Sequence, residues 1–175
     1  DVLAPDGKKR RSKMPWSALA YQLAGDAGLK VLHPDGKAEE RDSAPATNLL
    51  TELFALPTKE GLATLILIDE VLMYAREKVA FEKEWRSKLV NFFQYLTQAV
   101  AKVDRCCLVA SLLATDPRKS DVLGREIQSE LYDIIQRQRE EAVEPVVKED
   151  VAEVLRRRFF TPESLKDRDL AISRA

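Results

Sequence analysis

Two long runs of apolar residues stand out from the mixed hydrophobic and polar pattern of this chain. LATLILID ends at Asp69, and RCCLVASLLATD ends at Asp116. Neither run alternates between apolar and polar positions, which is typical of strands in a parallel sheet that is covered on both faces. We therefore expect two buried strands in the middle of the chain.

Helical periodicity surrounds these two runs. Apolar residues recur at helical spacing in MPWSALAYQLAG, in ATNLLTELFAL, over residues 81–102 and over residues 120–138. Pro15 suits the first turn of the first helix, Gly25 suits its end, and Pro57 ends the second. We expect the aromatic residues of the third helix to lie in the core.

The C-terminal third continues the alternation of strands and helices. EEAVEPVV reads as a third strand, which Pro145 would place at an edge of the sheet. KEDVAEVLRRRFF predicts a helix that is acidic at its start and basic at its end, as the helix dipole favours. Alternating strands and helices predict an α/β fold, a parallel sheet between helices in three α-β-α layers.

Composition and charge exclude several classes of function. The 175 residues are 45% hydrophobic and 33% charged, as in a soluble globular domain. The formal net charge is -1 at pH 7, so we expect no general attraction to nucleic acid or to an anionic membrane. Because His33 is the only histidine, neither a histidine-based metal site nor a Ser-His-Asp triad is expected.

The cysteines and the start of the chain indicate where the protein works. Cys106 and Cys107 are adjacent, so in a strand they point to opposite faces and a disulfide between them would be strained. We expect a reduced, cytoplasmic protein. No apolar run is long enough to span a bilayer, and no signal peptide follows the basic start. The chain lacks an initiating methionine, so we expect that it was cut from a longer protein.

Residues 1–13 carry a basic cluster of Lys8, Lys9, Arg10, Arg11 and Lys13. Their polar character favours a flexible, solvated segment. A patch that contacts phosphate, or that directs localisation, is the alternative.

Candidate chemistry lies at the ends of the two apolar runs. Asp69 and Glu70 follow the first run, and Ser111 ends the apolar part of the second. In open α/β sheets, ligands bind beyond the carboxyl ends of the strands. An aspartate there can order the water shell of Mg²⁺, and a glutamate can orient the water that attacks a nucleoside triphosphate. A solvated strand end is the plainer explanation for the acids, and a turn-capping hydroxyl is the plainer explanation for Ser111.

Two further observations bear on a nucleotide site. Arg137 ends the helix over residues 120–138, where an arginine could reach the phosphate of a neighbouring subunit or simply favour the helix dipole. No GxxxxGK[ST] motif occurs in the 175 residues, so the chain lacks the loop whose backbone amides would hold phosphates. We therefore expect weak or absent ATP binding by this chain alone.

The order and spacing of several motifs resemble one known family. PWSALAYQLAG, LILIDEVLMYAR, LTQAV, CLVASLLATD and RQREEAVEPVVKEDVAEVLRRRFF are similar to a prokaryotic family of AAA+-like P-loop ATPases, catalogued as domain of unknown function 499. Members of that family are often encoded with methyltransferases and helicases in anti-phage defence clusters. The resemblance implies that residues 14–147 are part of an AAA+-like P-loop NTPase core and that residues 148–175 begin its helical lid.

The resemblance also assigns roles to the candidate residues. It implies that Asp69 and Glu70 are the Walker B pair, that Ser111 takes the sensor-1 position and that Arg137 is a finger acting within a homo-oligomer. It implies Mg²⁺ and ATP as cofactors of the complete protein, with the phosphate loop upstream of this segment. The segment SALAYQLAGDAG departs from the pattern, because it has alanines where the family tends to carry glycine.

Two classes of function follow as expectations. The first is part of an ATPase that couples ATP hydrolysis to remodelling of a partner, with defence-system proteins as candidate partners. The second is a non-catalytic interaction or scaffold module whose nucleotide site is incomplete. Nucleic-acid binding through the basic cluster is disfavoured by the near-neutral charge.

Overall fold

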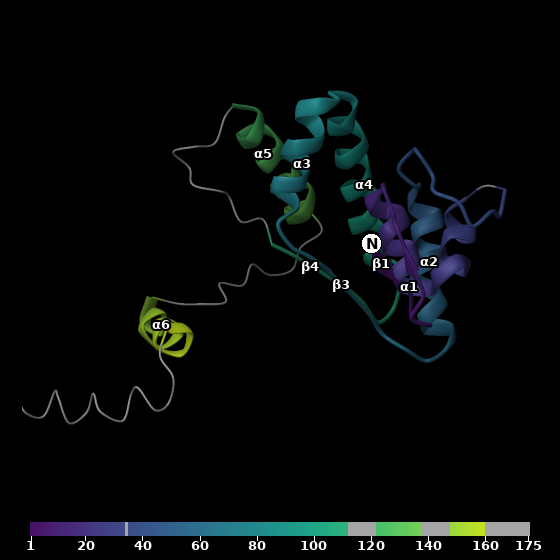
Figure 1. The fold of residues 1–175 in the computed structure, drawn as a ribbon, viewed down its shortest axis with the longest axis horizontal. Coiled ribbons are helices and arrows are strands. Elements are labelled where there is room, and N and C mark those ends of the chain that lie inside the picture. The colour runs from purple at the N-terminus through teal and green to yellow at the C-terminus, as the bar shows by residue number, and fades with distance from the viewer. Residues whose placement is uncertain (34, 112–121, 138–147, 160–175) are drawn as a thin grey trace, which may run out of the picture. The chain divides into compact units, whose positions relative to one another are not determined.

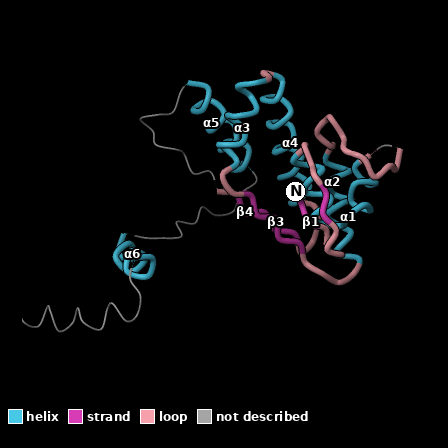
Figure 2. The backbone as a smooth tube through the Cα atoms, in the orientation of Figure 1, coloured by secondary structure: helices cyan, strands magenta, loops and turns pink. Residues whose placement is uncertain are grey.

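A computed structural model describes residues 1–33, 35–111, 122–137 and 148–159 of the chain. The chain divides into two compact units, residues 1–139 and residues 140–175. Figures 1 and 2 show the elements within each unit. In chain order these are β1 (Val2–Leu3), β2 (Lys9–Arg10), α1 (Pro15–Leu32), α2 (Thr47–Lys59), β3 (Thr64–Ile68), α3 (Val71–Phe81), α4 (Glu84–Val100), β4 (Cys106–Ala110), α5 (Val122–Arg137), the 3₁₀ turn η1 (Lys148–Asp150) and α6 (Val151–Phe159).

The central sheet of the first unit is a parallel pair of strands. β3 and β4 pair in a register that runs from Thr64 opposite Cys106 to Ile68 opposite Ala110. These are the two apolar runs, so the predicted parallel pairing is confirmed. β1 and β2 form a separate antiparallel pair in the N-terminal segment. The described structure is a mixed α/β fold that is mostly helical.

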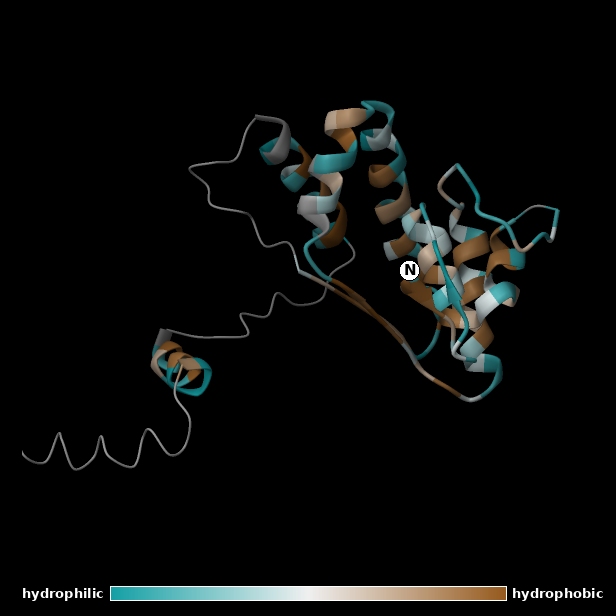
Figure 3. Cartoon of the chain, in the orientation of Figure 1, coloured by the Kyte–Doolittle hydropathy of each residue, from teal (hydrophilic) through white to brown (hydrophobic). Residues whose placement is uncertain are grey.

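Only one face of the β3–β4 pair is covered by the described helices. Ile66 is buried in the core that the helices form, whereas Leu65 and Leu67 are 62% and 69% exposed and Val109 is 53% exposed. Figure 3 shows both strands as a continuous apolar ribbon. The prediction that both faces are covered is therefore wrong for the described residues. An uninterrupted apolar sequence is typical of strands covered on both faces, and the described residues cover only one face of this pair.

The helical core forms around α1, α2 and α4. The Trp16 ring stacks on Trp85 at a centroid distance of 6.1 Å and lies 5.6 Å from the ring of Phe92. Trp16, Phe54 and Phe93 are almost fully enclosed. Burial of such rings supplies roughly 1.5–3 kcal/mol each. The prediction that Trp85, Phe92 and Phe93 belong to the core is confirmed, whereas Phe81, at the end of α3, is exposed.

The first helix is longer than expected and is broken in the middle. Gly25 has φ 56° and ψ −138°, a conformation that interrupts the helix where an end was predicted. The chain then resumes a helical course to Leu32. This return requires a close approach, because a Cβ placed on Gly28 would lie 2.2 Å from the carbonyl oxygen of Ala20.

The next two helices differ from their predicted bounds. Pro57 lies inside the last turn of α2, which ends two residues later at Lys59. The helix expected over residues 81–102 begins at Glu84, and α3 precedes it. Residues Ala75 and Val79 bury one side of α3.

The helix expected over residues 120–138 is α5, which packs against α3 and α4. Ile127, Leu131 and Ile134, which recur at helical spacing, are buried. Arg86 of α4 joins the two helices from outside, with Nη1 2.8 Å from Glu126 and Nη2 2.7 Å from Glu130. These carboxylates raise the pKa of Arg86 further, so the guanidinium stays charged.

The second unit contains η1 and α6, which confirm the helix predicted from KEDVAEVLRRRFF. Glu153 binds Arg156 and Arg157, and these guanidinium groups lower the pKa of its carboxyl to about 2. The predicted strand EEAVEPVV lies outside the described residues. Across the described ranges, no helix has the length and apolar character required to cross a bilayer.

Candidate functional site

The acids Asp69 and Glu70 follow the last residue of β3. The backbone N–H of Ser111, the residue after β4, donates to the carbonyl oxygen of Ile68 at 2.8 Å. Because the two strands are parallel and in register, this bond places Asp69 and Ser111 beyond the same edge of the sheet. The fold therefore brings together three of the residues that the sequence singled out.

Glu70 has an unusual backbone. Its φ and ψ of 53° and 28° lie in the left-handed region, which costs a residue with a side chain roughly 1–2 kcal/mol. The Asp69 carboxylate accepts the Glu70 backbone N–H at 2.9 Å, which fixes this turn directly before α3. Such strained residues cluster at functional sites. The turn lets the chain leave the strand and start the helix within two residues.

Both carboxylates are exposed to solvent. They lie at the amino end of α3, where the partial positive charge of the helix favours anions. None of the side chains that the structure describes forms an ion pair with either acid. Two adjacent carboxylates at this position can attract a hydrated cation.

The described residues contain no cluster of three or more His, Cys, Asp or Glu side chains able to hold a metal ion. A dedicated protein cage is thus not formed here. Mg²⁺ is suited to such a sparse site, because it keeps several waters and takes one or two carboxylates together with phosphate oxygens. Asp69 fits this role, since one carboxylate oxygen accepts the Glu70 amide and the other has no assigned partner within the described structure.

Ser111 is half-buried at the end of β4. Its position beside Asp69 is the one that a hydroxyl would need to reach a phosphate bound beyond the sheet. Thr115 and Asp116, which follow in the sequence, lie outside the described residues.

Arg137 lies in the last turn of α5, and its side chain is exposed. It lines a small niche of about 80 Å³ with Gln94, Thr97, Gln98 and Ile134. That niche shares no lining residue with the surroundings of Asp69. A role in a neighbouring subunit's site stays a prediction.

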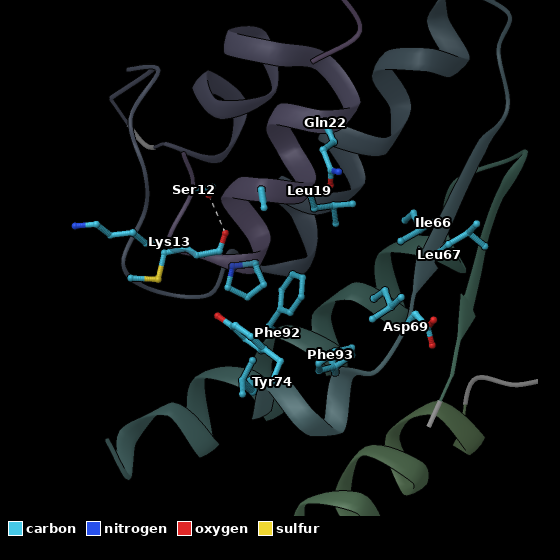
Figure 4. A pocket seen from close by; sticks show the side chains of 15 residues that line it. Ser12, Lys13, Leu19, Gln22, Ile66, Leu67, Asp69, Tyr74, Phe92 and Phe93 are labelled. Atoms are coloured by element: carbon cyan, nitrogen blue, oxygen red, sulfur yellow. Dashed lines mark hydrogen bonds between the residues drawn. The ribbon is translucent and has the colours of Figure 1, made fainter. Parts of the chain in front are cut away.

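A larger cavity of about 390 Å³ lies along the side of β3 that faces away from β4 (Figure 4). Its walls are mainly apolar side chains from β3, α1 and α4. Asp69 and Tyr74 stand at its rim, and burial raises the pKa of the Tyr74 hydroxyl. The cavity was not expected from the sequence, because an aromatic stripe on a helix gives the same pattern whether it faces packed core or open space.

The two cysteines of β4 are both free thiols, as expected. Cys107 is on the exposed face of the sheet, whereas Cys106 is half-buried. Burial, together with the neighbouring Cys107, raises the pKa of Cys106 to about 11. This thiol is therefore protonated and unreactive near neutral pH.

Comparison with known proteins places these features in one family. The family model of the DUF499 N-terminal domain matches residues 5–143, which is more than half of the chain and includes Asp69, Glu70, Ser111 and Arg137. No curated protein and no solved structure matches the chain significantly.

Proposed function

This chain belongs to the DUF499 family through its N-terminal domain, and we propose that it is part of an AAA+-like P-loop ATPase core. Such a core would couple ATP hydrolysis to remodelling of a partner. The observation that carries the proposal is the position of Asp69, Glu70 and Ser111 together beyond the carboxyl ends of two parallel strands. Crevices at this edge are where open α/β sheets bind nucleotides.

Each residue has a role in the proposed reaction. Asp69 would hold the water shell of Mg²⁺, and Glu70 would orient the water that attacks the γ-phosphate. Bound Mg²⁺ supplies positive charge that offsets the charge developing on the phosphates. Ser111 would donate a hydrogen bond to a phosphate oxygen or to the attacking water. Arg137 would act on the nucleotide of a neighbouring copy.

The phosphate loop is the part that this chain does not contribute, because no GxxxxGK[ST] motif occurs in it. We place that loop in sequence outside these 175 residues. Without backbone amides around the β- and γ-phosphates, the negative charge of the two carboxylates would repel the phosphates. This repulsion would offset the attraction of the carboxylates to the bound Mg²⁺. The chain alone should therefore bind Mg-ATP weakly and turn it over at no measurable rate.

The test compares this chain with a version extended upstream in its own gene until a phosphate loop is included. We expect saturable Mg-ATP binding and turnover in the extended protein. Glu70→Gln should retain binding but lower turnover by roughly a hundredfold or more, since it removes the group that orients water. Glu60→Gln is the matched control, because Glu60 is equally exposed at the end of α2 and should leave turnover unchanged.

A non-catalytic scaffold is the second candidate function. The absence of a phosphate loop in the chain and the exposed apolar face of its sheet favour it. Failure of both the short and the extended proteins to bind Mg-ATP would support the scaffold and contradict the ATPase. Participation in anti-phage defence is a further proposal, which a plaque assay of the Glu70→Gln variant in its native gene cluster would test.

A further inference from the structure

The edge of β3 that faces away from β4, here called the outer edge, combines three features of a binding site. These are its backbone groups, the adjacent cavity and the two acids at its end. In the β3–β4 ladder, the Thr64 N–H donates to Arg105 and the Ile68 carbonyl accepts from Ser111. Backbone groups alternate in direction along a strand, so those of Leu65 and Leu67 face the other way. No strand among the described residues pairs with that edge. Within the described part of the chain, the backbone N–H and C=O groups of Leu65 and Leu67 therefore have no strand partner.

The cavity of about 390 Å³ lies directly along this edge. Ile66, Leu67, Ile68 and Asp69 form one wall, and the first turns of α1 form the opposite wall. Figure 4 shows Leu19, Ile66 and Phe92 around the same space. An apolar space of this size is costly when empty, because its lining side chains lose dispersion contacts and remain in water.

An extended chain would both pair with the backbone groups of the β3 edge and fill the apolar cavity. A small apolar molecule could fill the space, but it would leave the row of backbone groups unpaired. A strand would pair with that row and place alternate side chains into the cavity and over the exposed Leu65 and Leu67.

Charge complementarity selects the kind of strand. Asp69 and Glu70 lie at the carboxyl end of this edge, and neither forms an ion pair with a described side chain. A strand that runs parallel to β3 would end beside these two acids. A basic residue at that end would be attracted, and an acidic one would be repelled.

We propose that the outer edge of β3 binds an extended apolar peptide segment in the parallel direction, with a basic residue directly after its last apolar position. The proposal goes beyond nucleotide hydrolysis and does not require it. The strand shares Asp69 and Glu70 with the proposed nucleotide site, but it uses only their negative charge, together with the edge of the sheet and the α1–β3 cavity. Loss of Mg-ATP binding would leave it intact.

The test uses the full 175-residue chain and a fluorescein-labelled probe peptide, Ser-Ser-Ile-Val-Ile-Lys-Ser. Fluorescence anisotropy should show saturable binding, and amide hydrogen exchange should slow at Leu65 and Leu67. A probe with glutamate in place of lysine should bind about tenfold more weakly. A probe with proline at the central valine should bind about tenfold more weakly or not at all, because it lacks the N–H that pairs with the edge.

Two variants on α1 locate the peptide. Ala18 lines the cavity, whereas Ala27 is exposed on the same helix and does not. Ala18→Trp should fill the cavity and weaken binding about tenfold or more, and Ala27→Trp should leave it unchanged. The peptide series on the unaltered chain decides the question even where Ala18→Trp fails to fold.

Three results would overturn the proposal. The first is equal binding of the lysine, glutamate and proline probes, which would indicate non-specific adhesion. The second is unchanged exchange at Leu65 and Leu67 under saturating probe. The third is concentration-dependent dimerisation of the chain, by sedimentation, that protects the same two amides and assigns the edge to a second copy.

Discussion

At the residue scale, the strain at Glu70 is the most informative feature of the site. Two residues other than glycine have a left-handed backbone within the described structure, Glu70 and Arg105. Arg105 precedes β4, at the opposite end of the sheet from the acids. Glycine would adopt either conformation without the steric cost that a Cβ brings. At Glu70 the chain bears this steric cost, which is consistent with a functional role for the carboxylate.

Glu70→Gly should therefore stabilise the protein. We expect the free energy of unfolding to rise by about 0.5–1 kcal/mol, because relief of strain exceeds the extra entropy of glycine in the unfolded chain. Arg105→Gly should give a similar gain. Urea denaturation measures both. In the extended protein, only Glu70→Gly should abolish turnover, whereas a loss of stability in Glu70→Gly would show that the side chain is held for structure.

Some of these residue positions could be predicted and others could not. Asp69 and Ser111 could be placed together from sequence, because each directly follows an apolar run that reads as a strand. The conformation of Glu70 could not, since no glycine or asparagine marks the turn. The cavity could not be predicted either, because Phe92 and Leu19 occur at the same helical spacing as residues that pack in a core.

At the scale of elements, α5 is held on α4 by an apolar seam and one charged clamp. Ile127, Leu131 and Ile134 form the seam, and Arg86 binds Glu126 and Glu130 outside it. The clamp is about one-third exposed at Arg86, so solvent screens it. Its contribution should be smaller than that of the seam.

Arg86→Ala should lower the free energy of unfolding by about 1 kcal/mol, because a guanidinium shared by two carboxylates is stronger than an isolated surface pair. The loss should shrink in 1 M salt, where charges are screened. Lys59→Ala is the control, since Lys59 has no ion pair within the described structure. An equal effect of Arg86→Ala at low and high salt would assign the loss to packing of the arginine stem.

The helices and strands were predicted best where periodicity was strong. α4 and α5 follow the apolar spacing of their sequences closely, and the two strands match their apolar runs. The second half of α1 was missed because Gly25 signals an end, whereas the chain resumes its helix after two non-helical residues, Ala24 and Gly25. α3 was missed because only two residues separate it from β3 and because its apolar residues are interleaved with charges.

At the scale of the whole molecule, the sequence describes a larger sheet than the described residues form. The uninterrupted apolar pattern of β3 and β4 is that of strands with cover on both faces, but Leu65, Leu67 and Val109 are exposed. The apolar pattern indicates that these strands are buried, but it does not indicate which segment or partner chain covers them. The parallel pairing of the two strands could thus be predicted, while the three-layer core stays a prediction.

The central claim is that Asp69, Glu70 and Ser111 form one edge of a Mg²⁺-triphosphate site. Its most direct test is the broadening of amide signals by Mn²⁺-ATP in an NMR spectrum of the full chain, because a paramagnetic ion reveals even weak binding to its nearest neighbours. We predict that the signals of Asp69, Glu70 and Ser111 broaden first and that Asp69→Asn removes the effect. Broadening centred on the basic residues Lys8 to Lys13, or unchanged in Asp69→Asn, would contradict the account.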